Sequence, residues 1–279
     1  MIIWIASYPK SGNTWLRSFL STYFHTDEEI FKFEYLKKIK QFNSKEFGEV
    51  EIPNINTALE NLQRAQKKII EREEITFLKT HSSLLPINGF NFTNRNYTAG
   101  AVYIVRDPRN VITSLSNHYS FDFEKSLDFM LNSKKYIIDD RENNTNFSTF
   151  QFISSWSNNY KSWKNCKEFK ILFIKYEDLE NNQFNTFLKV IKFINSICSK
   201  KKELSNSRIK SIIESISFDL LKNKEQEEGF PESVADQNRN KISFFYLGKK
   251  NQWDKIYDQK KIEKLNNVFK AELIDLKYV

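Results

Sequence analysis

Cysteine and histidine are scarce in this chain, and long apolar runs are missing. Only Cys166 and Cys198 occur among 279 residues, too few and too isolated for a disulfide framework. The three histidines all stand apart from the cysteines, so we expect no zinc site. We expect no other metal either, because the loop around Gly12 lacks the hydroxyl arrangement that holds magnesium. No apolar run approaches the roughly 18 residues that cross a bilayer, and the N-terminus lacks the pattern of a signal peptide. These absences predict a protein of the reducing cytoplasm with no integral membrane segment.

Glycine and proline are also few, at six and five residues, and they do not gather into a linker. No internal repeat is visible, so we expect one domain over residues 1–279, a length that can bury one sizeable core. Apolar residues make up 40% of the chain, which is typical of a globular protein. The net charge of +8 favours anionic or nucleotide-like partners but indicates no fold.

Four short apolar runs, each bounded by polar residues, predict buried β-strands. They are 2–6, 75–78, 101–105 and 171–174. Helical patterns lie between and after them, at 59–74, around 127–131, at 152–163 and from about 258 to 276. Strands that alternate with helices predict an α/β fold with a central parallel sheet flanked by helices.

The first strand runs into the polar loop Ser-Tyr-Pro-Lys-Ser-Gly-Asn-Thr at 7–14, and a helical pattern begins at Trp15. Such a junction aims backbone N–H groups and the positive end of a helix dipole at an anion. Lys10 adds a mobile charge, and the hydroxyls of Ser11 and Thr14 add donors. We therefore expect a phosphate site. It is not the common nucleotide loop, because the lysine precedes the glycine instead of following it.

The string Tyr-Pro-Lys-Ser-Gly-Asn-Thr-Trp at 8–15 resembles the 5′-phosphosulfate loop of the sulfotransferases that use 3′-phosphoadenosine 5′-phosphosulfate (PAPS). The resemblance implies a P-loop-like α/β fold and PAPS as the co-substrate. It also implies that the loop binds this donor through Lys10, Ser11, Gly12, Asn13, Thr14 and Trp15. Asn13 departs from the family, where threonine is more frequent, but keeps a hydrogen-bond donor.

A second strand-to-helix junction lies at Arg106, where another apolar run ends. Asp107 can cap the next helix and Pro108 fits its first turn, and Ser114 faces the same way two turns on. A guanidinium at the carboxyl end of a strand, beside a hydroxyl, suits a phosphate dianion. The segment 102–114 resembles the 3′-phosphate-binding segment of the same sulfotransferases, which implies that Arg106 and Ser114 bind that phosphate.

The run Phe-Leu-Lys-Thr-His at 77–81 carries the candidate catalytic base. A neutral imidazole near an alcohol is a good general base close to neutral pH. In sulfotransferases a Lys-Thr-His run supplies this base. The resemblance therefore implies His81 as the base, with Lys10 and Lys79 stabilising charge on the leaving phosphate. His25 and His118 have no such context, so a structural role is the default for both.

Two aromatic residues match weaker segments of the family. Tyr176 follows the fourth strand, where the family's tyrosine contacts adenine. Phe218 matches a phenylalanine that packs on adenine opposite the tryptophan to which Trp15 corresponds. Two aromatic faces around a purine are physically reasonable, because stacking demands little of the sequence. Core packing remains the alternative for both residues.

The segment 245–253 keeps Gly248 and Trp253, but Tyr246 and Leu247 stand where the family usually has Arg-Lys before the glycine. One 3′-phosphate contact is therefore in doubt, and weaker PAPS binding is expected because a charge-assisted hydrogen bond contributes roughly 1.5–3 kcal/mol. The candidates to replace it are Lys249, Lys250, Arg239 and Lys241. We include Gly248 and Lys249 in the expected donor site.

Together these segments predict a PAPS-dependent sulfotransferase that modifies a hydroxyl or amine of a small-molecule or carbohydrate acceptor. A nucleotide-dependent kinase would need a metal-binding carboxylate and a lysine after the glycine, and the sequence offers neither. A degenerate relative that binds nucleotide or polyanion without chemistry stays open because of Tyr246 and Leu247. Nucleic-acid binding is not expected, since no reader motif and no clustered basic stripe occurs.

The sequence identifies neither the acceptor nor the oligomeric state. The aromatic residues Phe31, Phe33, Tyr35 and Phe42 either line an apolar pocket for a phenol or lipid or pack in the core. A sugar or polysaccharide acceptor is equally open.

Overall fold

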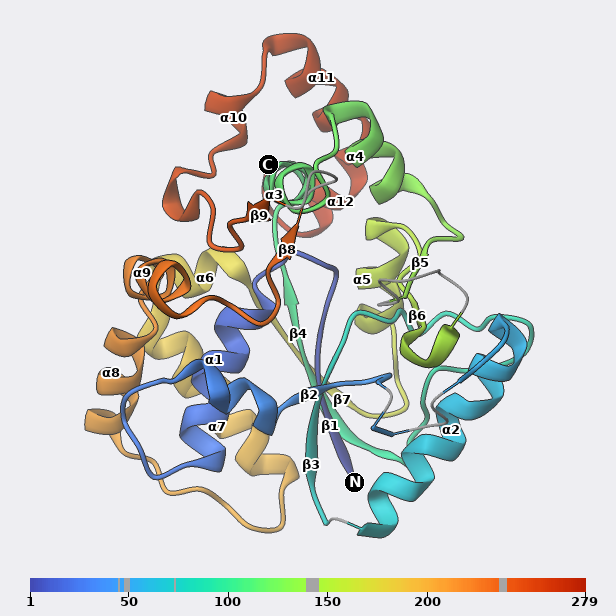
Figure 1. Ribbon diagram of the computed structural model, residues 1–279, viewed down its shortest axis with the longest axis vertical. Coiled ribbons are helices and arrows are strands. Elements are labelled where there is room, and N and C mark those ends of the chain that lie inside the picture. The colour runs from blue at the N-terminus through green and yellow to red at the C-terminus, as the bar shows by residue number, and fades with distance from the viewer. Residues whose placement is uncertain (45, 48–50, 73, 139–145, 236–239) are drawn as a thin grey trace.

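A computed structural model describes residues 1–44, 46–47, 51–72, 74–138, 146–235 and 240–279 of the chain. In these ranges a five-stranded sheet forms the centre, with helices on both of its faces (Figure 1). Its strands run in the order β2 (Lys40–Gln41), β3 (Thr76–Thr80), β1 (Ile2–Ser7), β4 (Thr98–Val105) and β7 (Lys170–Lys175), and all neighbours are parallel. The predicted α/β class is confirmed, and all four predicted strands form.

Strand β1 is buried along its whole length, which explains its continuous apolar sequence. Ile2, Trp4 and Ala6 face one half of the core, and Ile3 and Ile5 face the other. A parallel sheet covered on both faces requires apolar side chains at successive positions instead of alternate ones. Strand β2 carries no such signal, because two residues are too few to show a pattern.

Two layers of helices cover the sheet (Figure 1). One layer contains α1 (Asn13–His25), α7 (Gln183–Ile197) and α8 (Asn206–Ser215). The other contains α2 (Ile55–Arg72), α5 (Trp156–Lys164), α11 (Gln259–Val268) and α12 (Lys270–Asp275). None of the helices in the described part of the chain combines the length and the apolar character needed to span a bilayer.

Further helices and small strands complete the described part of the fold. The helices among them are η1 (Phe33–Lys38), α3 (Pro108–Tyr119), α4 (Phe123–Leu131), η2 (Phe147–Thr149), α6 (Tyr176–Asn181), α9 (Phe218–Glu228), η3 (Gly248–Lys250) and α10 (Trp253–Ile256). The strands are β5 (Tyr136–Ile137) with β6 (Gln151–Phe152), and β8 (Val234–Ala235) with β9 (Lys241–Ile242).

Several helix boundaries differ from the sequence-based expectation. Helix α4 already begins at Phe123, and α5 begins at Trp156 instead of 152, because residue 152 belongs to β6. Helix α1 begins at Asn13, two residues before Trp15, and α2 begins at Ile55 instead of Leu59. The expected single C-terminal helix is divided into α11 and α12 at Phe269, whose ψ of 14° leaves the helical range. The apolar stripe did not reveal this break, because Leu265, Phe269 and Leu273 stay buried on both sides of it.

The sheet topology brings the predicted motifs to one edge. Strand β1 pairs with β3 on one side and with β4 on the other, so Ala6 lies opposite both Thr80 and Tyr103. The segments that follow these three parallel strands therefore emerge together at their carboxyl ends. Ligands of open α/β sheets bind in the crevice where the strand order reverses in this way.

Candidate functional site

A cavity of about 620 Å³ opens at the carboxyl ends of β1, β3 and β4. Most of the predicted site residues line it, namely Lys10, Gly12, Asn13, Thr14, Trp15, Lys79, His81, Arg106, Ser114, Tyr176, Phe218, Gly248 and Lys249. Ser11 does not line it, and its hydroxyl is buried without a hydrogen-bond partner among the described residues. Segments far apart in the sequence thus converge on one site.

The loop between β1 and α1 requires a glycine at its tightest point. Gly12 has a φ of +96°, and a Cβ atom there would lie 2.5 Å from Cδ2 of Tyr176. Helix α1 begins directly after it with no side-chain cap and no acidic residue in its first turn. Its N-terminal N–H groups and dipole therefore favour an anion, as the sequence predicted.

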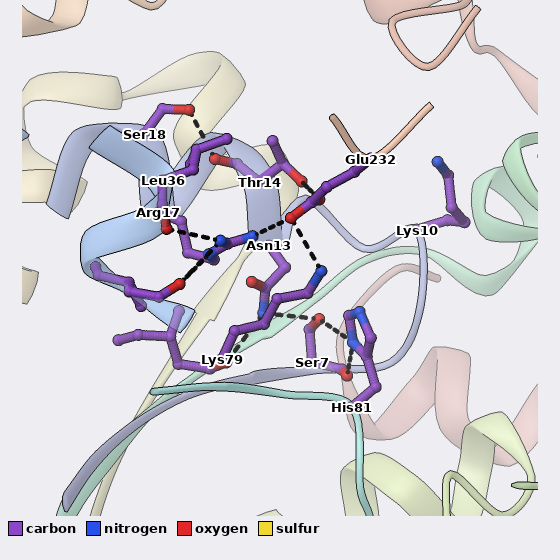
Figure 2. A network of polar contacts seen from close by, with 12 residues as sticks. Ser7, Lys10, Asn13, Thr14, Arg17, Ser18, Leu36, Lys79, His81 and Glu232 are labelled. Carbon is purple, nitrogen blue, oxygen red and sulfur yellow. Dashed lines mark hydrogen bonds and ion pairs between the residues drawn. The ribbon is translucent and has the colours of Figure 1, made fainter. Parts of the chain in front are cut away.

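Asn13 fastens this loop to the strand before it. Its Nδ2 donates to the backbone oxygen of Ile5 at 3.0 Å and to Oγ of Ser7 at 3.2 Å (Figure 2). Both contacts lie within the loop and β1. The side-chain amide that the resemblance assigned to the donor thus holds the loop in shape in this structure.

The ammonium group of Lys10 lies against the ring of Phe244 and beside a second histidine, His118. Its Nζ is 3.7 Å from the ring centroid of Phe244 and 3.5 Å from Nδ1 of His118. Burial, with Lys79 and Arg106 nearby, lowers the pKa of Lys10 to about 7, although Glu232 opposes the shift. Burial and Lys10 in turn lower the pKa of His118 to about 3. The expected role of His118 was structural by default, although this residue follows Ser114 by one helical turn and shares its face.

His81 is held in one tautomer by the end of β1. Its Nδ1 lies 2.8 Å from the backbone oxygen of Ser7 (Figure 2). Because a carbonyl oxygen only accepts, Nδ1 carries the hydrogen and Nε2 keeps its lone pair. Burial, with Lys79 nearby, lowers the pKa of His81 to about 3, so the imidazole is neutral at physiological pH. The backbone on either side of the ring is fixed by Gln151 and Asn159.

Arg106 is buried with unused hydrogen-bonding capacity. It is only 7% exposed, and its guanidinium stacks on Tyr176 with 3.9 Å between Cζ and the ring centroid. One nitrogen, Nη1, donates to the backbone oxygen of Lys10 at 3.4 Å, while Nε has no partner among the described residues. A buried guanidinium with an unpaired donor can bind an anion. As predicted, Asp107 caps α3 and Pro108 occupies its first turn.

An aromatic wall lies beside these charges. The rings of Trp15 and Tyr176 are 5.5 Å apart, and Phe218 lines the same cavity. Gly248 packs directly on Phe218, since a Cβ atom there would lie 2.6 Å from two ring carbons. The glycine of the 245–253 segment therefore lets the chain approach this ring.

The segment that departs from the family pattern also faces the cavity. Tyr246 and Leu247 line it, and so does Lys249, whereas Lys250 does not. Lys241 donates instead to the backbone oxygen of Glu225 at 3.3 Å. Arg239 lies outside the described residues. Of the four proposed replacement cations, Lys249 is thus the one that the described cavity contains.

Glu232 was missed by the sequence analysis, yet it lies at the centre of the polar network in Figure 2. Its carboxylate accepts from Nη1 of Arg17 at 2.6 Å, from Oγ1 of Thr14 at 3.1 Å and from Nζ of Lys79 at 3.4 Å. Burial alone would raise the pKa of Glu232, but Lys79 and Arg17 outweigh it and hold that pKa well below its usual range. No motif surrounds this residue, so the sequence carried no signal for it.

The side of the cavity near His81 is mixed in character. Gln41, Ser44 and Gln151 give it polar groups, and Ile137 and Ile138 give it apolar ones. The aromatic residues considered for an acceptor pocket, Phe31, Phe33, Tyr35 and Phe42, are instead all buried in the core and line no part of this cavity. Within the described ranges, no three His, Cys, Asp or Glu side chains are grouped as metal ligands would be.

Known proteins share this architecture. Mouse sulfotransferase SULT7A1 complexed with PAP superposes with a TM-score of 0.58 at 18% identity, covering 98% of this chain and 84% of that one. Retinol dehydratase in complex with androsterone and the inactive cofactor PAP gives a TM-score of 0.60 at 18% identity, covering 98% and 80%. At this identity the likeness establishes the fold.

Sequence relatives carry the assignment further. Sulfotransferase 1B1 of Canis lupus familiaris is 26% identical over 274 residues, covering 96% of this chain and 82% of the relative. Luciferin sulfotransferase of Photinus pyralis and sulfotransferase 1E1 of Rattus norvegicus are matched over 56% and 65% of their own length. The sulfotransferase domain family itself matches residues 2–277. The chain therefore belongs to the sulfotransferase family of enzymes, as its loop, its Lys-Thr-His run and its strand-end arginine had predicted.

Proposed function

We propose that this protein transfers the sulfuryl group of PAPS to a hydroxyl or amine of an acceptor, with His81 as the general base. The observation that carries the proposal is the neutral imidazole of His81, with its Nε2 lone pair, in the same cavity as the anion-binding loop and Arg106. We further propose that residues 1–279 act as one domain in the cytoplasm. Both cysteines are free thiols, which suits that compartment.

The residues present fit the donor. The buried Nε of Arg106 lacks a partner, as expected of a phosphate ligand, and Ser114 and Lys249 line the same cavity. Lys10 and the N-terminus of α1 would hold the 5′ side. Trp15, Phe218 and Tyr176 would hold the purine. PAPS, when bound, supplies an electrophilic sulfur and a 3′,5′-diphosphate leaving group.

His81 takes the proton of the acceptor at Nε2 as the acceptor oxygen forms its bond to sulfur. Its Nδ1–H remains bound to the backbone oxygen of Ser7, which orients the ring and stabilises the positive charge that develops. Lys10 and Lys79 stabilise the negative charge on the bridging oxygen as its bond to sulfur breaks. This is the same combination of positioning and electrostatics that phosphoryl transfer uses.

A non-catalytic relative that only binds nucleotide is the second candidate. Tyr246 and Leu247 favour this candidate, because they stand where the family usually has two positive charges. In this part of the described cavity wall, Lys249 supplies the positive charge. The acceptor is proposed as a small molecule or a carbohydrate, in keeping with the mixed wall near His81. Nucleic acid is not proposed as a partner.

Calorimetric titration with adenosine 3′,5′-diphosphate (PAP), and with adenosine 5′-monophosphate as its control, tests the donor site. We expect PAP to bind at least about tenfold more tightly, because Arg106 adds charge-assisted hydrogen bonds to the 3′-phosphate. Equal affinities would remove the 3′-phosphate site from the proposal. Absence of binding by both nucleotides would contradict the proposed function altogether.

The variant Gly248→Ala should weaken the binding of both adenine nucleotides by about fivefold or more, because a stacked base contributes ~1–3 kcal/mol. The new methyl would lie 2.6 Å from the ring of Phe218 and force that ring to move. Gly89→Ala is the matched control, since Gly89 also has a positive φ but no atom within 4 Å of the position of a Cβ. Calorimetry on both variants measures the effect. Wild-type affinity in Gly248→Ala would mean that Phe218 does not contact the base.

A further inference from the structure

The carboxylate of Glu232 binds two groups that PAPS is also expected to bind. Thr14 belongs to the predicted 5′-phosphosulfate loop and Lys79 to the predicted catalytic pair, and both bind this carboxylate in the present structure (Figure 2). The hydroxyl of Thr14 has a single hydrogen, so it can donate to Glu232 or to a phosphate but not to both at once. The contact and the expected donor contact are therefore mutually exclusive.

The fixed position of Arg17 indicates that the contacts of Glu232 belong to a preorganised anion-binding site. Its side chain is only 3% exposed and is clamped from behind, because its guanidinium donates to the backbone oxygens of Leu36 and Ile39. Its Nη1 points at the carboxylate of Glu232 at 2.6 Å. A fixed guanidinium, an ammonium and a hydroxyl thus converge on one anion.

The segment that presents Glu232 is anchored by the aromatic contacts of the neighbouring Phe230. Phe230 is 6% exposed and packs against the rings of Phe33, Phe244 and Phe245. Pro231, Glu232 and Val234 all line the cavity. The carboxylate therefore enters the cavity from a segment that the core holds in place.

We propose that Glu232 is an internal competitor of the donor, whose carboxylate binds Thr14 and Lys79 of the expected 5′-phosphosulfate site and must release them when the nucleotide binds. The inference rests on the proposed function, since it takes Thr14 and Lys79 as donor-binding groups. Two anions cannot share Thr14 and Lys79 at hydrogen-bonding distance without strong repulsion. Glu232 consequently lowers the affinity for nucleotides with a 5′-phosphate.

The test is calorimetric titration of the wild type and Glu232→Gln with PAP and with adenosine 3′-monophosphate, which lacks the 5′-phosphate. Loss of one competing charged contact should tighten PAP binding by about tenfold or more, with adenosine 3′-monophosphate unchanged. Glu228→Gln is the charge-matched control, because Glu228 is exposed on α9 and should alter neither affinity. Thermal unfolding of the unliganded variants confirms that each is folded.

Three other results would be decisive in the opposite direction. If the wild type binds both nucleotides and Glu232→Gln binds PAP no more tightly, Glu232 only positions Lys79 or stabilises Arg17. The inference is then wrong, while the proposed function stands. If Glu232→Gln tightens both ligands equally, the effect is general electrostatics and the inference also falls. If neither nucleotide binds any variant, the proposed function is contradicted, and the inference that rests on it is contradicted as well.

A variant that retains the charge guards against a folding failure of Glu232→Gln. In Glu232→Asp the carboxylate is one methylene shorter, so we expect it to lose one of its contacts to Thr14 and Arg17. We expect PAP to bind this variant more tightly than the wild type but less tightly than a variant without the charge. Affinity equal to the wild type would overturn the inference.

Discussion

Replacement of His81 by asparagine should lower turnover by about 10²–10⁴-fold while leaving the affinity for PAP unchanged. Asparagine keeps the approximate size of the ring but cannot take a proton. The nucleotide site is spared, because the contacts of His81 are to Ser7, Gln151 and Asn159 and not to the anion-binding groups of the loop. Turnover is measured as PAP released from PAPS with a panel of phenols, alcohols and sugars, using the acceptor that the wild type converts fastest.

His25→Asn is the matched control for this experiment. His25 lies at the end of α1, with its ring edge-on to Phe77, and it does not line the cavity. The same chemical change there should leave turnover intact. Full activity of His81→Asn would exclude His81 as the base and would turn attention to His118, the other histidine of the cavity.

The pH profile is a second readout of the same prediction. Burial, with Lys79 nearby, lowers the pKa of His81 from its ordinary value of 6.5 to about 3. A general base works in its unprotonated form, so His81 stays competent down from neutral pH and is lost only as the pH falls towards this lowered pKa. We therefore expect kcat/KM to show no acid limb from His81 near pH 6.5. An acid limb centred there would mean that His81 titrates as an ordinary histidine.

Replacement of Arg106 by alanine should weaken PAP binding by roughly 10- to 150-fold, the equivalent of one charge-assisted contact. The guanidinium is buried, stacked on Tyr176 and without a described partner at Nε, so we expect a phosphate to complete its hydrogen bonds. Adenosine 5′-monophosphate should lose much less affinity, because it lacks the 3′-phosphate. The measurement is the ratio of the affinities for PAP and for adenosine 5′-monophosphate, determined by calorimetry.

Arg106→Lys separates charge from geometry. Lysine restores the positive charge but neither the planar stack on Tyr176 nor the paired donors. We expect it to recover only part of the affinity for PAP. An equal loss for both nucleotides in Arg106→Ala would instead indicate that Arg106 acts by holding the loop through the backbone oxygen of Lys10.

Much of the fold follows from local sequence patterns. The run Ile2–Ser7 must be covered on both faces because every residue in it is buried, and a continuous apolar run expresses that requirement directly. The loop at 7–14 and the cap at Asp107 are equally local, since a few neighbouring residues fix their geometry. The break at Phe269 escaped prediction because burial continues across it and no glycine or proline marks it.

By itself, the sequence determined the α/β class, the family and thirteen site residues that line the cavity. These properties depend on strand periodicity and on motifs whose residues are close together in the chain. Only the tertiary structure decided that Glu232 binds Thr14 and Lys79, and that His118 stands against Lys10. It also decided the tautomer of His81, which depends on the backbone oxygen of Ser7. Such contacts join residues separated by 70 or more positions, and they arise only when the parallel strands bring their carboxyl ends together.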